Sequence, residues 1–580
     1  MSVLRTILKS LRENKKPTLY SLVFILGEVF LEVLIPFITA GMVNDINAGA
    51  GVSDILPKGL LMVLAALASL AFGTLAGTYS AKASAGLARN LRYDVFSKIQ
   101  DFSFANIDKF STSSLVTRTT TDITNVQNSY MMMIRTAVRS PVMMIFAVAM
   151  GFILGGRLAL TFVIVIPVLA FGLIMIARKA MPAFVAVFRK YDRLNGSVEE
   201  NVRAMRVVKG FAREEYETKK FSAASEDIRK DFTKAERIVA MNAPLMSLCM
   251  YFNMLFILFV GSKLIISSMG VSINVGQITA MITYGVQVLM SLMMISMIYV
   301  MLTMSLESMK RLAEVLNEVP TIKDKADAVT EVADGSIDFT DVHFKYSEKA
   351  EREALYDIDL HIDSGMTVGI LGGTGSSKST LVQLIPRLYD VTSGTVKVGG
   401  LDVREYDLQS LRDAVAVVLQ KNVIFSGTIS DNLRWGNENA TQEQIEEACR
   451  LAQADDFIRS FEKGYDTKIE QGGTNVSGGQ KQRLCIARAL LKKPKILILD
   501  DSTSAVDMKT DALIRKGFKE YIPDTTKIII AQRVASVMDA DMIVIMDGGR
   551  IAASGTHDEL LVSSDIYREI YEQQTKGGEE

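Results

Sequence analysis

Six long apolar segments in the first 304 residues constrain the fold of this 580-residue chain more than any other feature. Each reaches or approaches the ~20 residues that a helix needs to cross a bilayer. Such segments must be helical, because the membrane interior offers no water to the backbone polar groups. They occupy residues 19–42, 59–79, 136–154, 158–177, 243–266 and 278–304. The sequence therefore predicts a membrane domain of six helices.

Basic residues alternate between the polar segments on the two sides of these helices. Lysine and arginine are typical of cytoplasmic loops. They number five in residues 1–18, none in 43–57, seven in 80–135, one in 155–157, fifteen in 178–240 and none in 264–277. This alternation places both termini and the two long loops in the cytoplasm. Because both long loops carry helical periodicity, we expect the helices to continue well beyond the bilayer; separate globular insertions are the alternative.

The pattern changes after residue 335. Short β-rich runs such as TVGIL and KILIL alternate there with polar helical stretches, which is typical of an α/β domain. The polar stretch at 305–335 is expected to connect this domain to the membrane helices. The net charge of −1 gives no overall field that would select nucleic acid as a partner.

The sequence ILGGTGSSKSTL at 370–381 nearly matches the phosphate-loop pattern G-x-x-x-x-G-K-[ST]. A predicted strand precedes it and a predicted helix follows, as such a loop requires. Backbone N–H groups would hold phosphate oxygens, Lys378 would contact the β- and γ-phosphates, and Ser379 would bind magnesium. Ser377 stands where the pattern has glycine. Its Cβ either reduces the fit to the phosphates or is tolerated if its φ is negative.

Two further motifs accompany this loop. Asp500 and Asp501 follow the run KILIL, where a magnesium-orienting carboxylate belongs, and NVSGGQKQR stands upstream at 475–483. The pentapeptide VSGGQ within it resembles the LSGGQ signature of the ATP-binding cassette (ABC) family, and the resemblance covers essentially the whole chain. It implies an exporter with a transmembrane domain at 1–304, a linker at 305–335 and an α/β P-loop nucleotide-binding domain at 336–580.

The resemblance implies ATP and Mg²⁺ as cofactors and assigns their contacts. Tyr346 matches the aromatic residue that stacks on adenine, and Gln420 matches the glutamine that contacts magnesium. Residues 504–507 match the segment that communicates across the dimer, and VKGFAREEYE resembles an intracellular loop whose short helix docks on a nucleotide-binding domain. The implied magnesium ligands are Ser379, Gln420 and Asp500. The implied nucleotide contacts are Tyr346, Gly372, Gly373, Thr374, Gly375, Ser376, Ser377, Lys378, Ser379, Thr380, Gln420, Ser477, Gly478, Gly479 and Gln480.

Two departures from the family pattern affect catalysis. Asp501 stands in place of the glutamate that acts as general base, and its shorter side chain loses ~1 Å of reach, which can cost on the order of 100-fold in rate. Gln532 stands in place of the switch histidine and can neither titrate nor carry charge. The signature pentapeptide, which serves the other site of a dimer, is intact. This asymmetry resembles the degenerate-site half of a heterodimeric multidrug ABC exporter.

The sequence thus indicates ATP-driven export of a hydrophobic or amphipathic substrate (drug-like, lipid or peptide) by alternating access. The expected partners are a second ABC half-transporter, whose competent site is completed by Ser477 to Gln480 of this chain, membrane lipid and the substrate, but no nucleic acid. The expected location is a bacterial plasma membrane, with both termini and the nucleotide-binding domain in the cytoplasm. Two alternatives stay open: a homodimer with two slow ATP sites, and a regulatory or channel-like subunit that binds ATP without driving transport.

Two carboxylates lie inside the first predicted span. Glu28 and Glu32 are four residues apart and share one helical face. Charged groups within a membrane are costly and usually face a cavity or a partner. They would either attract a cationic substrate or pair with a basic group of the partner chain.

Overall fold

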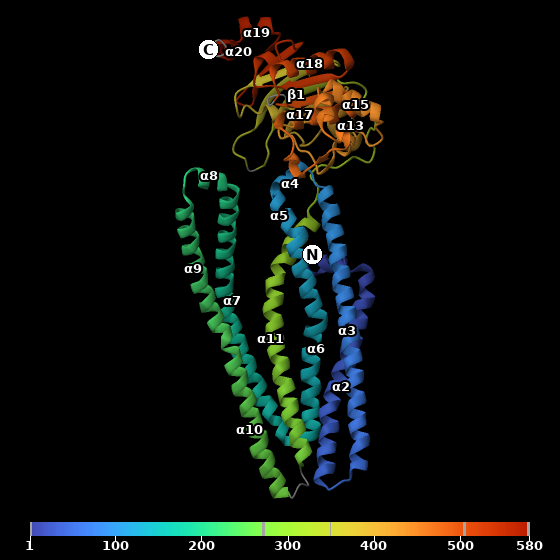
Figure 1. Cartoon of the computed structure of the whole chain (residues 1–580), viewed down its shortest axis with the longest axis vertical. Helices are drawn as coiled ribbons and strands as arrows, with labels where there is room; N and C mark the ends of the chain where they lie inside the picture. The colour runs from blue at the N-terminus through green and yellow to red at the C-terminus, as the bar shows by residue number, and fades with distance from the viewer. Residues whose placement is uncertain (1–2, 269–272, 349, 503–505, 577–580) are drawn as a thin grey trace. The chain divides into compact units, whose positions relative to one another are not determined.

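A computed structural model describes residues 3–268, 273–348, 350–502 and 506–576 of the chain (Figure 1). The chain forms two compact units. One comprises Met1–Asp101 and Ser111–Glu318, and the other comprises Phe102–Phe110 and Val319–Glu580. A short segment from the first half of the sequence therefore belongs to the second unit.

The first unit is built of long helices. Each of the six predicted apolar segments lies in its own helix, and the prediction of six membrane helices is confirmed. Five helical stretches of the described residues are long and apolar enough to span a membrane, and one of these, Thr112–Arg203, contains two of the predicted segments. The six helices are α2 (Lys15–Asn47), α3 (Val52–Gln100), α6 (Ile123–Gly155), α7 (Leu160–Arg203), α10 (Asn242–Ser268) and α11 (Val275–Asn317).

Helices also make up the two long polar loops, as the periodicity predicts. Helix α3 has 49 residues, which corresponds to about 70 Å at 1.5 Å per residue, more than twice the ~30 Å hydrocarbon core. The second loop consists of the end of α7, the short α8 (Met205–Gly210) and α9 (Glu214–Ala240). Helix α11 likewise continues to Asn317, so that the predicted connection at 305–335 begins as helix. The exact domain limits stay a prediction.

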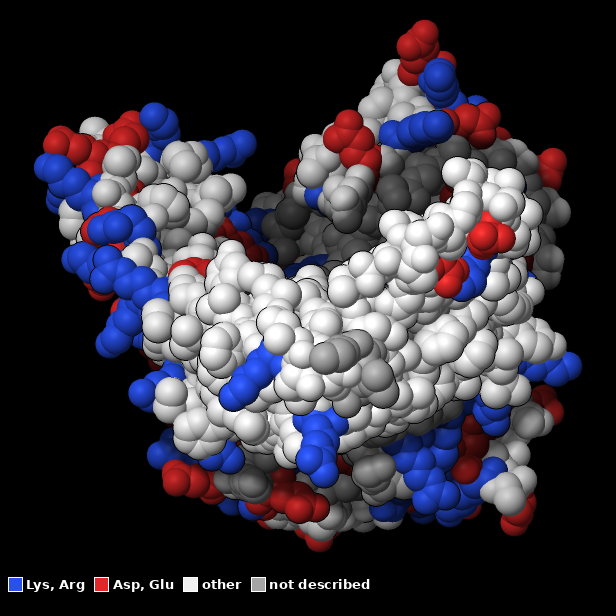
Figure 2. Space-filling view, turned by 90° about the horizontal axis from the view of Figure 1, so that it is seen from below, with Lys and Arg blue, Asp and Glu red and all other residues white. Residues whose placement is uncertain are grey.

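Large apolar side chains cover the outside of the membrane helices. Figure 2 views the protein from below, and most of the surface turned to the viewer carries no charged side chain. Leu70, Ile153, Phe171 and Phe259 are each more than two-thirds exposed. Such exposure is costly in water and favourable in lipid. The surface therefore agrees with the membrane location that the apolar segments predict.

An arginine of the same chain pairs with the two carboxylates of the first span. The Arg139 guanidinium on α6 lies 2.6 Å from Glu32 Oε2 and 3.4 Å from Glu28 Oε1, both on α2. A residue of the same chain therefore supplies a cation to both carboxylates. One guanidinium balances one of the two carboxylate charges, and the roles of Glu28 and Glu32 toward a substrate or a partner chain stay predictions.

The second unit is an α/β domain with two main sheets. A six-stranded sheet has the order β12-β11-β3-β10-β9-β6, parallel except for β12, and a four-stranded antiparallel sheet has the order β2-β1-β4-β5. The strands are β1 (Ile337–Phe344), β2 (Leu355–Ile362), β3 (Thr367–Gly372), β4 (Ser393–Val398), β5 (Leu401–Asp402), β6 (Val415–Val418), β9 (Ile496–Asp500), β10 (Thr526–Ile530), β11 (Met542–Asp547) and β12 (Arg550–Gly555).

Both faces of the six-stranded sheet are buried. In β9, Ile496 and Ile498 join one apolar cluster with the four-stranded sheet, and Leu497 and Leu499 join another with the helices. Alternating side chains point to opposite faces, so a strand covered on both sides must be apolar throughout. This explains the continuous apolar run before Asp500 and the fixed position of that carboxylate at the end of the strand.

Helix α4 (Phe104–Phe110) is the segment that the second unit takes from the first half of the chain. The Tyr389 hydroxyl donates a hydrogen bond to Asp108 Oδ2 over 2.7 Å, and the ring of Tyr389 packs edge-on against Phe104. The amide of Asn106 donates to the carbonyl of Val319. Side-chain contacts therefore join α4 to the α/β domain.

Candidate nucleotide-binding site

Four parallel strands bring the predicted site residues to one edge of the sheet. The phosphate loop follows β3, Asp500 ends β9, Gln420 follows β6 and Gln532 follows β10. Because these strands are parallel neighbours, their carboxyl ends meet at the same edge, where ligands bind in open α/β sheets. Residues separated by up to about 160 positions are thereby collected into one site.

The phosphate loop depends on unusual backbone conformations. Gly372 has φ of 152°, and a Cβ at this position would lie 2.2 Å from the carbonyl oxygen of Met546, so only glycine fits. Ser377 has φ of 70° and ψ of 23°, which is the left-handed region. Tolerance through a negative φ is therefore wrong. A side chain in this region costs on the order of 1–2 kcal/mol, which explains why glycine is the expected residue before Lys378.

The basic and hydroxyl groups of the loop are held in place. Lys378 Nζ donates hydrogen bonds of 2.8 Å to the carbonyls of Gly372 and Gly373, and burial lowers the pKa of its ammonium. Ser379 Oγ donates to Asp500 Oδ1 over 2.9 Å. Burial raises the pKa of the Asp500 carboxyl, and the charge of Asp501 acts in the same direction. A divalent cation beside Ser379 and Asp500 would offset this cost of burying the carboxylate.

The side-chain amides of two glutamines donate hydrogen bonds to the carboxylate of Asp501. Gln532 Nε2 donates to Asp501 Oδ2 over 2.7 Å, and Gln420 Nε2 donates to the same oxygen over 3.3 Å. Asp501 itself has φ of 50° and is 9% exposed. Gln532 and Gln420, which the sequence places in the switch and magnesium positions, therefore both contact the residue in the general-base position. An attacking water would have to compete with these two amide donors for the same carboxylate oxygen.

Tyr346 lies beside the start of α12 (Lys378–Gln383). Its hydroxyl hydrogen-bonds to Thr380 Oγ1 at 2.8 Å, and its ring packs edge-on against Phe344 and Tyr389. The side chain nevertheless stays 50% exposed. A ring that is anchored on one side and open on the other is suited to stacking on a nucleobase, and this role stays a prediction.

The signature residues begin α17 (Gly478–Leu491). Ser477 caps this helix, since Gln480 N–H donates to its Oγ and its own N–H donates to Gln480 Oε1 over 2.8 Å. Ser477 and Gly478 are exposed, and Gly479 and Gln480 are half-buried. Their contact with the ATP of a partner stays a prediction. Of the predicted segment at 504–507, Ser504 and Ala505 lie outside the described residues, and Asp507 caps the helix that follows.

Gln482 is a site residue that sequence reasoning missed. It lies in α17 only 2% exposed, and its Nε2 donates to the backbone carbonyl of Asp501 over 3.3 Å. The signal in the sequence is a polar residue at a buried position of an amphipathic helix, which requires a hydrogen-bond partner. No sequence pattern indicates that this partner is the residue in the general-base position.

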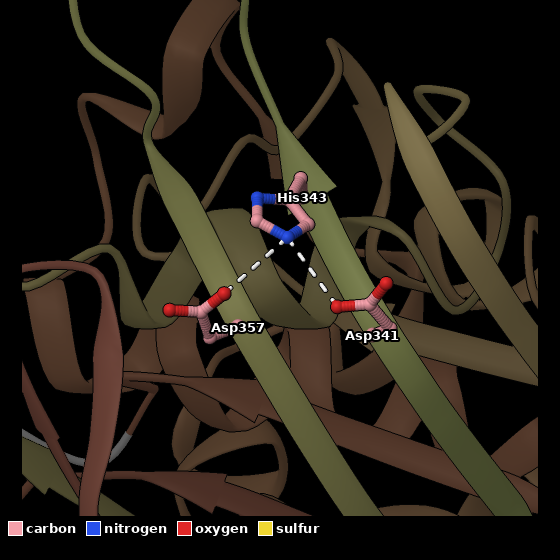
Figure 3. Close-up of side chains that lie close together, drawn as sticks. All are labelled: Asp341, His343 and Asp357. Atoms are coloured by element: carbon pink, nitrogen blue, oxygen red, sulfur yellow. Dashed lines mark ion pairs between the residues drawn. The ribbon is translucent and has the colours of Figure 1, made fainter.

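A second group of titratable side chains lies on β1 and β2, away from the phosphate loop (Figure 3). His343 Nε2 lies 3.4 Å from Asp341 Oδ1 and 3.5 Å from Asp357 Oδ1, and its Nδ1 lies 2.8 Å from Glu353 Oε2. One potential metal-ligand atom from each of Asp341, His343 and Asp357 lies within 4.8 Å of the others. Arg550 pairs with Asp357 over 2.7 Å. We therefore interpret these side chains as an exposed ion-pair network.

Known proteins resemble both halves of the chain. A family model described as ABC transporter transmembrane region matches residues 18–292, and one described as ABC transporter matches residues 355–504. An uncharacterized ABC transporter ATP-binding protein of Bacillus subtilis, YfiB, is 35% identical over 96% of both chains. A fatty acid ABC transporter ATP-binding/permease protein of Mycobacterium bovis is 32% identical over 83% of this chain and 75% of its own length.

The fold also matches a solved structure. The structure of a bacterial Atm1-family ABC exporter with ATP bound superposes with a TM-score of 0.82, at 24% identity, and the match covers 97% of this chain and 98% of the other. This likeness establishes the fold of long membrane helices followed by an α/β nucleotide-binding domain.

Proposed function

The chain belongs to the ABC transporter family, as an exporter-type protein with fused membrane and ATP-binding regions, and from this premise we propose that it exports a hydrophobic or amphipathic substrate by alternating access. Drug-like molecules, lipids and peptides all fall within this class. ATP and Mg²⁺ bind at the phosphate loop, with Ser379, Gln420 and Asp500 around the metal and Lys378 on the phosphates. The nucleotide-binding domain and both termini face the cytoplasm of a bacterial cell, in agreement with the loop charges.

We further propose that the ATP site on this chain hydrolyses slowly. The observation that carries this proposal is the pair of amide hydrogen bonds from Gln532 and Gln420 to Asp501 Oδ2. A general base must lie within hydrogen-bond reach of the water that it activates. The aspartate is one methylene shorter than the family's glutamate, and its oxygen already accepts two donors. Ser377 adds backbone strain in the same site.

An ATP site of this kind suits one half of a heterodimer. The signature at the start of α17 is intact and exposed, so it can complete the competent site of a partner. The partner is expected to carry glutamate and histidine at the positions that correspond to Asp501 and Gln532. A partner sequence with aspartate and glutamine there would contradict this proposal.

Exposed apolar side chains on and beside α8 support dimerisation. In α8 and just after it, Val207 is 58% exposed and Phe211 is 76% exposed. On the α/β domain, the stacked rings of Phe425 and Trp435 line a cavity of about 290 Å³, and Trp435 is 67% exposed. We propose that α8 of each chain docks in this cavity of the other.

Crosslinking tests this docking. A cysteine at Phe211 should form an intermolecular crosslink with a cysteine at Val423, whereas a cysteine at Tyr521 should not.

The test of the slow site is ATP turnover in nanodiscs. The chain is assayed alone and together with the half-transporter with which it assembles. The expected result is near-background turnover alone and robust turnover for the pair, lost when the partner's general base is removed. Comparable turnover by this chain alone would favour the homodimer and would contradict the heterodimer. ATP binding without turnover in either sample would favour a regulatory or channel-like subunit.

A further inference from the structure

The membrane unit contains a large cavity between α7 and α11. Its volume is about 900 Å³, near the upper end of the range for ligand pockets. Aliphatic side chains from one face of each helix form most of its wall. The lining residues are Ala170, Leu173, Ile174, Ala177, Arg178, Met181, Pro182, Val185, Ala186 and Arg189 on α7, and Leu292, Ile295, Ser296 and Tyr299 on α11.

Two arginines give this apolar cavity a strong positive charge. Arg178 and Arg189 lie eleven residues apart, which is close to three helical turns and therefore the same face of α7. None of the described residues that line the cavity is acidic. Among the described side chains, neither guanidinium forms an ion pair or a side-chain hydrogen bond. By contrast, Lys190, the neighbour of Arg189, pairs with Asp231 on α9 over 2.7 Å.

Three of the polar groups, Arg178, Ser296 and Tyr299, gather at one level of the cavity. Leu173 on α7 and Leu292 on α11 belong to one apolar cluster, and the two helices run in the same direction (Figure 1). Because both rise 1.5 Å per residue, Arg178 lies at about the level of Ser296 and Tyr299. The wall before this level is aliphatic. The cavity thus has an aliphatic part, a level with one cation and two hydroxyl groups, and a second cation, Arg189, about 16 Å farther along α7.

From this arrangement we infer that the cavity binds the transported substrate, and that the substrate is an amphipathic anion with an apolar tail and a carboxylate or phosphate head group. This inference rests on the proposed export function. The tail lies along Leu173, Ile174 and Ile295, and the head group lies at Arg178, beside Ser296 and Tyr299. Arg189, about 16 Å farther along α7, adds positive charge to the approach. Arginine suits this role because its planar fork can donate two parallel hydrogen bonds to a carboxylate or phosphate.

The test measures binding of radiolabelled palmitate to the full-length assembly in phosphatidylcholine nanodiscs. Palmitate is expected to bind, and hexadecanol and hexadecyltrimethylammonium are expected to compete poorly. The double variant Arg178→Met/Arg189→Met should weaken binding at least about tenfold, because charge-assisted hydrogen bonds are lost. Arg178→Lys/Arg189→Lys keeps the charges and should restore part of the affinity. Elution as a single peak in size-exclusion chromatography shows that each variant is folded.

Lys179→Met is the matched control. It removes a positive charge close to the membrane surface but outside the cavity. Lys179 lies next to Arg178 at the same depth but does not line the cavity. Its removal should leave palmitate affinity unchanged. An equal loss in Lys179→Met, or equal binding of the cationic amphiphile, would overturn the inference. A phosphate head group is tested in the same way with hexadecyl phosphate as competitor.

ATP distinguishes a transported substrate from a resident lipid. Palmitate should raise ATP turnover, and trapping with vanadate and ATP should lower palmitate affinity severalfold. Affinity that does not change on trapping would mean a resident lipid and would overturn the assignment as substrate. ATP turnover without palmitate binding would overturn the inference and leave the export function standing. Palmitate binding through the two arginines without any ATP turnover would instead contradict the proposed function.

Discussion

Gln532 Nε2 donates a hydrogen bond to Asp501 Oδ2 over 2.7 Å, and this contact joins the two positions at which the chain departs from the catalytic pattern of its family. The two departures therefore form one local structure. Each of these side chains is positioned by the other. The effect of replacing one of them with the family's residue therefore depends on whether the other is replaced as well. Restoring the family's glutamate and histidine, singly and together, therefore tests whether this contact limits hydrolysis.

Restoring the glutamate should raise the activity of this site. Asp501→Glu returns about 1 Å of reach, and its kcat for ATP should rise by roughly tenfold to 100-fold when it is combined with Gln532→His. Asp501→Glu alone should give a smaller gain, because Gln532 still occupies the carboxylate. The measurement is ATP turnover of the assembled transporter whose other ATP site has been inactivated. No gain in the double variant would show that something else limits hydrolysis here.

Ser377→Gly should relieve strain in the phosphate loop. The residue sits at φ of 70°, so glycine should stabilise the native loop by about 1 kcal/mol. The expected result is a higher thermal unfolding midpoint of the full-length chain, because the left-handed φ is present before ATP binds. Gly375→Ala is the converse control, because Gly375 has φ of 84° and open space around it, so only backbone strain changes. Equal unfolding midpoints for wild type and Ser377→Gly would contradict the strain interpretation.

Arg139→Met should destabilise the membrane unit. It leaves Glu28 and Glu32, which are 12% and 28% exposed in their side chains, without their cation. Breaking such a partly buried network costs about 1–3 kcal/mol, less than the loss of a fully buried pair. Thermal unfolding in detergent should report a lower midpoint. The triple variant with Glu28→Gln and Glu32→Gln should recover most of the loss, and its failure to do so would show that Arg139 acts through packing.

The ion-pair network on β1 and β2 should make stability depend on pH. The hydrogen bond to Glu353, together with the charges of Glu353 and Asp341, raises the pKa of His343 above its usual value. A raised pKa means that the stabilising contribution is complete below about pH 6.5 and is lost as the pH rises through the raised pKa. His343→Gln should therefore lower the unfolding midpoint more at about pH 6 than at about pH 8.5.

Glu353→Gln supplies the control for this pH dependence. It removes the main partner of His343 but leaves Asp341 and Asp357 in place. In this background the pH dependence of the His343→Gln effect should shrink. A constant difference in midpoint between wild type and His343→Gln at all pH values would contradict the titration of His343 as its cause.

The sequence predicted the elements of the fold well because each had a local signal. Apolar length placed six helices, and strand–loop–helix order placed the phosphate loop. The contacts of Glu32 with Arg139 and of Gln532 with Asp501 join residues that are 107 and 31 positions apart, and no local pattern could predict them. The left-handed φ of Ser377 also could not be read from the sequence, since a near-match to a motif does not determine backbone angles. The cavity between α7 and α11 depends on which helices become neighbours.

The buried amide of Gln482 connects the helix of the signature residues with the backbone of Asp501, and in the proposed dimer it would link the two ATP sites. Its helix begins with the signature residues, which would contact the nucleotide of the partner, while its amide holds the backbone of Asp501 beside the nucleotide of this chain. If the signature residues contact the partner's nucleotide as proposed, a displacement of α17 during closure would reach the backbone of Asp501 through this hydrogen bond. A slow site connected in this way can sense the progress of its faster neighbour without hydrolysing its own ATP.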